Sequence, residues 1–349
     1  MYITDLKAIS PQESYTEEVL SGQFKVHTEM VYRAIEPNYI GFIPKGLLRR
    51  MGKAVRMGVG SGLPLINDHQ DIEGILVATA NGGMEDCIKF LNQIVDYDEG
   101  ILTPTNFVQS TPNAIAGQIA LLGQNRGYNI TYTNGGLAFE NALQDAMLLF
   151  EEGSCNKLLV GGVEEISDYS YNIDFLLGKY KTEPIDKEWC LDSNTAGAFC
   201  GEGASFFVLA SGPKGSLCRI KDLDQITYPK ESDMDQIVSN LLSRNGLTPA
   251  EIDSVVLGYN GDVRHNNWYD HIGNSVFGDA NVFCFKHLVG EYRVCSSAAL
   301  WLLTHLFQGN SHLYTKMIKE NRHDKPLKNT LIYNHFDADQ HSFILVQRN

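Results

Sequence analysis

Apolar and polar residues follow two periodicities along the N-terminal part of the chain. Short runs of consecutive apolar residues predict buried strands, and apolar residues recurring every three or four positions predict helices. The predicted strands are 74–80, 129–132, 157–162 and 205–210, and the predicted helices are 84–94, 112–122 and 137–151. This alternation of strands and helices is typical of an α/β fold.

The same alternation returns after a Gly/Pro cluster at 211–215, which is suited to a boundary. The predicted helices there are 234–244 and 296–307, and the predicted strands are 254–257, 281–285, 330–334 and 342–346. The last two strands are expected to form a closing hairpin. Two halves of similar order indicate a duplicated α/β fold, which we divide into residues 1–213 and 214–349.

Two segments of the first half interrupt this pattern. Residues 103–107 read Thr-Pro-Thr-Asn-Phe, which we interpret as a turn, and residues 168–198 combine Gly, Pro and charged residues, which favours a loop-rich stretch. Neither segment is expected to contribute a strand to the sheet.

The composition narrows the range of possible functions. The chain has 349 residues, 43% of them hydrophobic, and its 28 Lys+Arg against 42 Asp+Glu give a formal net charge of −14. An acidic protein of this kind repels nucleic acids and anionic membranes. Seven cysteines without C-x-x-C spacing indicate neither a disulfide framework nor a zinc ribbon. We expect a soluble cytoplasmic protein with no metal and no cofactor.

The turn after the strand at 129–132 is the first candidate for chemistry. Thr133 stands where a strand runs into a long helix, followed by Asn134 and two glycines. The amino end of a helix offers free N–H groups and a positive partial charge, which stabilise a nucleophile or an oxyanion. The alternative is structural, because Thr or Asn at this position also caps a helix.

Several segments together resemble the β-ketoacyl synthases, in the order in which that family carries them. The first is 2–14, which is similar to the family's opening hairpin, and the others are Arg49-Arg-Met-Gly52, 103–107 with 111–113, Val160-Gly-Gly-Val-Glu164 and the Gly-Glu-Gly-Ala block of 192–204. The resemblance covers nearly the whole chain. It implies the thiolase fold, with duplicated α/β halves in five layers (αβαβα), and a dimer.

The catalytic positions of the family are changed in this chain. Where active relatives carry Cys-x-Ser-Gly-Leu, the sequence reads Thr133-Asn-Gly-Gly-Leu137. The resemblance places the first family histidine at Gly258, or at Asn260 if the alignment shifts by two residues. The family lysine is kept as Lys286, but the second histidine becomes Glu291.

The glycine-rich loop near the C-terminus is changed as well. The family pattern Asn-x-Phe-Gly-Phe-Gly-Gly appears here as Asn334-His-Phe-Asp-Ala-Asp-Gln340. The first family phenylalanine is kept as Phe336, and the one that gates the active site corresponds to Ala338. By resemblance, the substrate-binding positions are those equivalent to binding residues of the family: Thr133, Asn134, Lys286, Phe336 and Ala338.

These changes remove the ordinary condensing chemistry. A ketosynthase needs a thiolate to accept the acyl chain and two imidazoles to stabilise the developing negative charge. The hydroxyl of Thr133 is far less acidic than a thiol, and an ionised Glu291 opposes enolate formation. We expect Glu291 to form a buried ion pair with Lys286 instead.

The resemblance therefore implies a chain length factor, a ketosynthase-like subunit that pairs with an active ketosynthase and shapes the growing chain, here most similar to aryl polyene and flexirubin systems. Acyl carrier proteins are acidic, so carrier docking is assigned to the partner. The alternatives are a homodimeric acyl-chain-binding protein and a stand-alone acyltransferase, malonyl decarboxylase or thioesterase using Thr133, Asn134 or Glu291. Cys200 or Cys295 as a surrogate nucleophile is a further alternative.

Overall fold

The computed structural model describes residues 1–102, 104–184 and 193–349, so Thr103 and Asp192 of the motifs above lie outside the described residues. The strands are β1 (Tyr2–Ile9), β2 (Val31–Tyr32), β3 (Gly74–Ala78), β4 (Tyr128–Tyr132), β5 (Lys157–Glu164), β6 (Cys200–Gly201), β7 (Gly203–Ala210), β8 (Cys218–Thr227), β9 (Ser254–Leu257), β10 (Asn281–Cys284), β11 (Ile318–Glu320), β12 (Asn329–Phe336) and β13 (Gln340–Arg348). The α-helices are α1 (Lys45–Leu48), α2 (Lys53–Asp68), α3 (Met84–Asp96), α4 (Pro104–Gln109), α5 (Ala114–Leu122), α6 (Ala138–Glu151), α7 (Asp168–Leu176), α8 (Glu231–Arg244), α9 (Asn266–Asp270), α10 (Lys286–Val289), α11 (Ser296–Phe307) and α12 (Ser311–Met317).

The strands form two sets with the same topology. The first set has the spatial order β4-β3-β5-β7-β1, and the second has the order β10-β9-β12-β13-β8, with β11 added at its edge. In both sets the first three strands are parallel, and the next two pair antiparallel. A short antiparallel pairing of Tyr2 and Ile3 with β8 joins the sets. This repetition agrees with a duplicated fold, and the division after residue 213 remains our proposal.

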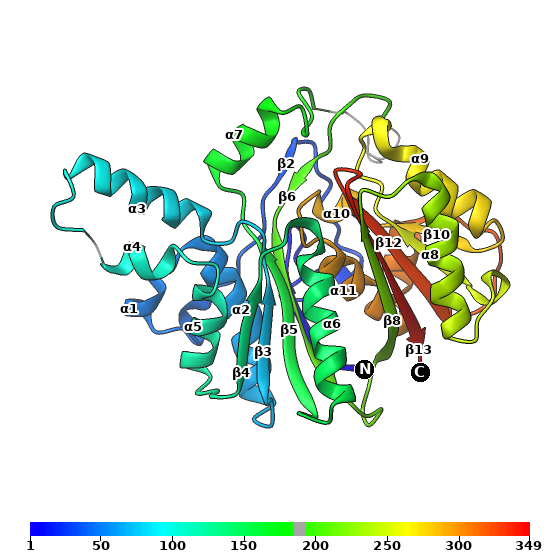
Figure 1. The fold of residues 1–349 in the computed structure, drawn as a ribbon, viewed down its shortest axis with the longest axis horizontal. Coiled ribbons are helices and arrows are strands. Elements are labelled where there is room, and N and C mark those ends of the chain that lie inside the picture. Colours follow the sequence, from blue (N-terminus) through cyan, green and yellow to red (C-terminus); the bar gives the residue numbers. More distant parts are fainter. Residues whose placement is uncertain (103, 185–192) are drawn as a thin grey trace.

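Three large hydrophobic clusters account for the predicted five layers, and a fourth, small cluster contains Ile166, Tyr180 and Cys200. Helices α6 and α11 lie between the two sets of strands (Figure 1). Alternate residues of β3 pack into different cores. Leu76 packs into the central core around α6 and α11, whereas Ile75 and Val77 pack into an outer core with α2 and α5. The second sheet divides in the same way, since Val256 of β9 faces the central core and Val255 faces the outer core under α8. Successive side chains of a strand point to opposite faces, so both faces of each sheet are buried.

Most predicted elements are present, with three corrections. Residues 104–109 form α4 instead of a turn, because Pro104 supplies the fixed φ that suits a first helical turn. Residues 168–176 form α7 within the stretch expected to be loop-rich. The N-terminal segment is a single strand, β1, which pairs with β7 and β8 and makes no hairpin of its own.

One long helix, α2, has no counterpart among the predicted elements. Its sequence contains three glycines and Pro64, which are weak helix formers. The glycines serve close packing: a Cβ on Gly58 would lie 2.4 Å from Cγ2 of Ile115 on α5. Tertiary packing therefore stabilises a helix that its local sequence disfavours. No helix in the described ranges is long and apolar enough to span a membrane.

Candidate functional site

The changed family positions of the C-terminal half meet at one edge of its sheet. The loop after β9 carries Gly258 and Asn260, α10 follows β10 and leads to Glu291, and β12 ends at Phe336. Strands β9, β10 and β12 are parallel, so their carboxyl ends lie at the same edge. Ligands bind at this edge in open α/β sheets.

Glu291 is the centre of a buried polar cluster. Its Oε2 accepts hydrogen bonds from Lys286 Nζ and from Asn260 Nδ2, both at 2.7 Å. Lys286 is 1% exposed and Glu291 is 4% exposed, so the predicted ion pair is present and shielded from water. The cluster neutralises the carboxylate instead of leaving it to act as a base.

A thiol completes this cluster. Cys295 Sγ lies 3.5 Å from Glu291 Oε1, and Asn334 Nδ2 approaches the sulfur at 3.8 Å. Burial raises the pKa of the Cys295 thiol to about 12, with Lys286 opposing the shift and Glu291 adding to it. Burial likewise raises the pKa of Cys200 to about 12. Neither sulfur is a thiolate at neutral pH, which is the reactive form.

Gly258 occupies a position with no room for a side chain. A Cβ there would lie 2.2 Å from Oδ1 of Asn334 and 2.8 Å from the hydroxyl of Tyr269. Both neighbours are fully buried. An imidazole at this position would therefore require the end of β12 and helix α9 to move apart.

The β12–β13 connection is a tight turn that replaces the glycine-rich loop. The N–H of Asp339 donates to the carbonyl of Phe336 at 3.1 Å, and both central residues, Asp337 and Ala338, have φ of +56°. Two positive φ values identify a type I′ turn. At the position that the resemblance assigns to the gate, this turn carries only the methyl group of Ala338.

Phe336 lies under two cations beside this turn. The guanidinium of Arg293 is 4.8 Å from its ring centroid, and Lys179 Nζ is 5.5 Å from it. Asp174 pairs with both cations, at 2.9 Å with Arg293 and at 3.4 Å with Lys179. This arrangement holds the ring between the strand–helix turn and the Glu291 cluster.

A hollow of about 20 Å³ remains at this edge. That volume holds about one water molecule. The residues around it are Lys179, Tyr180, Ala198, Asn260, Asp262, His265, Glu291, Phe336 and Asp337. Lys179, His265 and Asp337 are additions to the site that sequence reasoning missed, although the proximity of His265 to Asn260 in the sequence was a usable signal.

The strand–helix turn of the N-terminal half lies on the other side of Phe336. Thr133 and Asn134 are exposed and do not line the hollow. Gly136 donates its N–H to Oε1 of Gln340 at 2.6 Å, and a Cβ on Gly136 would lie 2.4 Å from Cβ of Phe336. Phe336 thus touches this turn at Gly136 and lines the hollow together with Asn260 and Glu291, whereas Thr133 does not line it.

The histidines near the site are held in structural roles. Nδ1 of His335 accepts the N–H of Ala338 at 3.2 Å, and Nε2 of His287 is 3.0 Å from the carbonyl oxygen of Lys316. Burial lowers the pKa of His287 to about 3 and lowers that of His335 far below its usual range. Both imidazoles are therefore neutral at physiological pH.

Comparisons with known proteins agree with this architecture. Residues 25–174 match the family model for the β-ketoacyl synthase N-terminal domain. The whole chain superimposes on a β-ketoacyl synthase from Burkholderia phymatum STM815 with 16% identity and a TM-score of 0.82, covering 99% of that chain.

Two further solved structures are similar over 100% of this chain and 98% of their own. They are the ishigamide ketosynthase/chain length factor, with 14% identity and a TM-score of 0.79, and the ketosynthase ApeO in complex with its chain length factor ApeC from Xenorhabdus doucetiae, with 14% identity and a TM-score of 0.76. No curated protein matches the sequence.

Proposed function

We propose that this chain, which carries a β-ketoacyl synthase N-terminal domain and has the fold of that family throughout, is a chain length factor type subunit that pairs with an active ketosynthase. The observation that carries the proposal is the neutralised Glu291. At a position where the reaction needs a hydrogen-bond donor for a developing anion, the chain holds a carboxylate bound to Lys286 and Asn260.

The geometry favours Asn260 as the counterpart of the first family histidine. The two histidines of an active site must lie near one another to serve one substrate, and Asn260 contacts Glu291 in the same way. Gly258, in contrast, is enclosed by Asn334 and Tyr269. On this assignment an amide and a carboxylate replace the two imidazoles. Neither can move protons as an imidazole does at neutral pH.

A stand-alone acyl-transfer activity at Thr133 has less support. An alcohol becomes a nucleophile only beside a base. Thr133 is exposed, and no histidine of the described ranges is hydrogen-bonded to it. The thiol of Cys295, the other candidate, is buried and protonated.

The surface of the N-terminal half supports pairing with another subunit. Helices α3 and α4 project from the molecule on the side of strand β4, and α7, at the top of the view, contacts α3 (Figure 1). They expose large apolar side chains, which are Leu91, Val95, Phe107, Val108, Ile173 and Leu176. Strand β4 is the edge of the sheet, with its outer backbone groups open to another strand. Such surfaces mark protein interfaces.

The partner in this proposal is a Cys-His-His ketosynthase of an aryl polyene type system. Two similar solved structures are described as a ketosynthase with its chain length factor, and a third as a ketosynthase with its acyl carrier protein. The net charge of −14 disfavours docking of an acidic carrier protein on this subunit. The catalytic partner therefore binds the carrier.

Co-expression with such a ketosynthase tests the pairing. We expect a stable 1:1 complex by size-exclusion chromatography with light scattering, and a shift in product length when this chain is left out. Val95→Asp places a charge on the exposed face of α3 and should weaken the complex. Tyr228→Asp, at an exposed residue of the C-terminal half whose φ of +53° suits Asp, is the matched control.

Recovery of only monomers or homodimers, with unchanged product length, would contradict the pairing.

The enzymatic alternative is tested by incubating the purified chain with malonyl and acyl carrier protein. Mass spectrometry should find no covalent acylation, and no carbon dioxide should be released. Turnover that disappears in Thr133→Ala would overturn the proposal in favour of an enzyme.

A further inference from the structure

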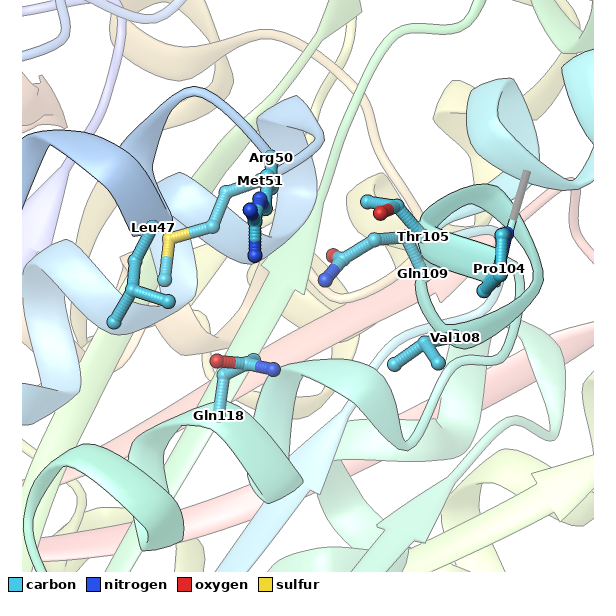
Figure 2. Close-up of a pocket in the computed structure, with 8 residues that line it drawn as sticks. All are labelled: Leu47, Arg50, Met51, Pro104, Thr105, Val108, Gln109 and Gln118. Carbon is cyan, nitrogen blue, oxygen red and sulfur yellow. The ribbon is translucent and has the colours of Figure 1, made fainter.

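A second and larger cavity lies away from the Glu291 cluster. It has a volume of about 240 Å³ and lies between the α1–α2 segment on one side and helices α4 and α5 on the other (Figure 2). Its walls are mostly apolar, formed by Leu47, Met51, Pro104 and Val108. Figure 2 shows these side chains around a common space, with Arg50, Gln109 and Gln118 reaching towards it.

Gln109 supplies the first polar feature of this cavity. Gln109 is only 5% exposed, and its Oε1 is enclosed by the protein, so the side chain meets the cavity through its amide nitrogen Nε2. An amide nitrogen is a hydrogen-bond donor, so an oxygen atom of a ligand in the cavity would accept a hydrogen bond from it.

Arg50 supplies the second polar feature. It lines the cavity from an exposed position, and its guanidinium forms no ion pair or hydrogen bond with the described part of the chain. Arginine is suited to bind a carboxylate with two parallel hydrogen bonds. The cavity therefore combines apolar walls, one amide hydrogen-bond donor and one cation at its rim.

We propose that this cavity binds a medium-chain carboxylic acid that carries a hydroxyl group. The carboxylate pairs with Arg50, the hydroxyl oxygen accepts from Gln109 Nε2, and the chain lies against Leu47, Met51 and Val108. With about 30 Å³ for each water-sized group, the cavity holds about eight such groups. None of these residues belongs to the Glu291 cluster, but Val108 is also part of the apolar surface proposed for pairing, so the test uses the isolated chain.

Calorimetric titration of the purified full chain tests the site, with 3-hydroxyoctanoate as the probe. Octanoate lacks the hydroxyl, and 1,3-octanediol lacks the carboxylate. We expect saturable 1:1 binding of 3-hydroxyoctanoate and about tenfold weaker binding of the other two, because each loses one polar contact.

Three variants locate the binding. Val108→Trp fills the cavity from a half-exposed position and should abolish binding without affecting the fold. Gln109→Leu should remove the preference for 3-hydroxyoctanoate over octanoate. Arg50→Gln should weaken binding of both acids about tenfold, whereas Arg49→Gln, at an exposed arginine outside the lining, should leave it unchanged.

The possible outcomes separate clearly. Loss of binding in Val108→Trp together with the Arg50 and Arg49 contrast supports the site. No saturable binding of 3-hydroxyoctanoate, undiminished binding in Val108→Trp, or equal losses in Arg50→Gln and Arg49→Gln would each overturn the proposal. Circular dichroism spectra of the variants should match that of the parent chain.

Discussion

At the residue scale, Glu291 and Lys286 stabilise the site only as a pair. Glu291→Gln removes the negative charge and leaves the ammonium of Lys286 buried beside a neutral amide. An unpaired buried charge is expensive, so we expect a loss of about 3–5 kcal/mol in the free energy of unfolding. Urea denaturation at pH 7 measures this loss.

The double variant Lys286→Met/Glu291→Gln is the control for this explanation. It removes both charges and should recover much of the lost stability, since a buried ion pair is often replaceable by neutral groups of similar volume. A double variant as unstable as the sum of the two single variants would show that the charges act independently.

A second residue-scale prediction concerns Gly258. Gly258→Ala forces a methyl group to within 2.2 Å of Asn334 Oδ1, so it should destabilise the protein by about 1–3 kcal/mol in the same urea assay. Gly212→Ala is the matched control, because nothing lies within 4 Å of a Cβ at that position. Equal effects of the two substitutions would contradict the packing argument.

These two sites differ in how far the sequence could predict them. The pairing of Lys286 with Glu291 was predicted from the resemblance, which places both residues at active-site positions of the family, and the ion pair is present. The crowding at Gly258 depends on Asn334 and Tyr269, which are distant in sequence. The burial of Cys295 likewise arises from the packing of α11 between the two sheets.

At the element scale, the β12–β13 turn carries an alanine where the backbone favours glycine. Ala338 has φ of +56°, a conformation that costs an L-residue about 1–2 kcal/mol. Glycine avoids this cost, but its greater conformational freedom in the unfolded state offsets part of the gain in stability. Ala338→Gly should therefore stabilise the protein by about 0.5–1 kcal/mol, measured as a rise in the urea midpoint. Ala120→Gly, inside α5, should have the opposite sign.

The elements themselves were predictable where local pattern and tertiary packing agree. Strands β3, β5 and β9 are continuous apolar runs, and α6 and α11 have strong helical periodicity, so their local sequences already indicate their structure. Helix α2 could not be predicted because its glycines are explained only by close tertiary contacts, with α5 for Gly58 and with Tyr39 for Gly60. Strand β8, in which polar and apolar residues are mixed and no continuous apolar run occurs, was also missed.

At the scale of the whole molecule, burial of histidines couples folding to pH. Burial lowers the pKa of His27, His305 and His341 to about 4 and that of His287 to about 3, and it also lowers that of His335. The unfolded chain protonates these groups near pH 6.5, before the folded chain does. Their contribution to stability is present above pH 6.5 and is lost as the pH falls towards 4.

Buried carboxyl groups act in the opposite direction within the same molecule. Burial raises the pKa of Glu164 to about 7, and it also raises those of Glu140, Glu165 and Asp86. The folded state holds these protons more tightly than the unfolded state, so their contribution is greatest at low pH and is lost as the pH rises through the folded pKa. They offset part of the histidine effect, and the observed slope is the difference.

One buried histidine, His305 on helix α11, tests this origin of the pH dependence. We expect the free energy of unfolding to fall as the pH is lowered from 6.5 to 4, with each histidine of folded pKa about 4 contributing about 3 kcal/mol over the window. His305→Phe keeps the ring contact with Trp301 and removes one proton from the balance, so the slope should decrease by up to about 1.4 kcal/mol per pH unit. Urea titrations at several pH values measure the slope. His312→Phe, at an exposed histidine, should leave it unchanged, and an equal change in both variants would contradict burial as the cause.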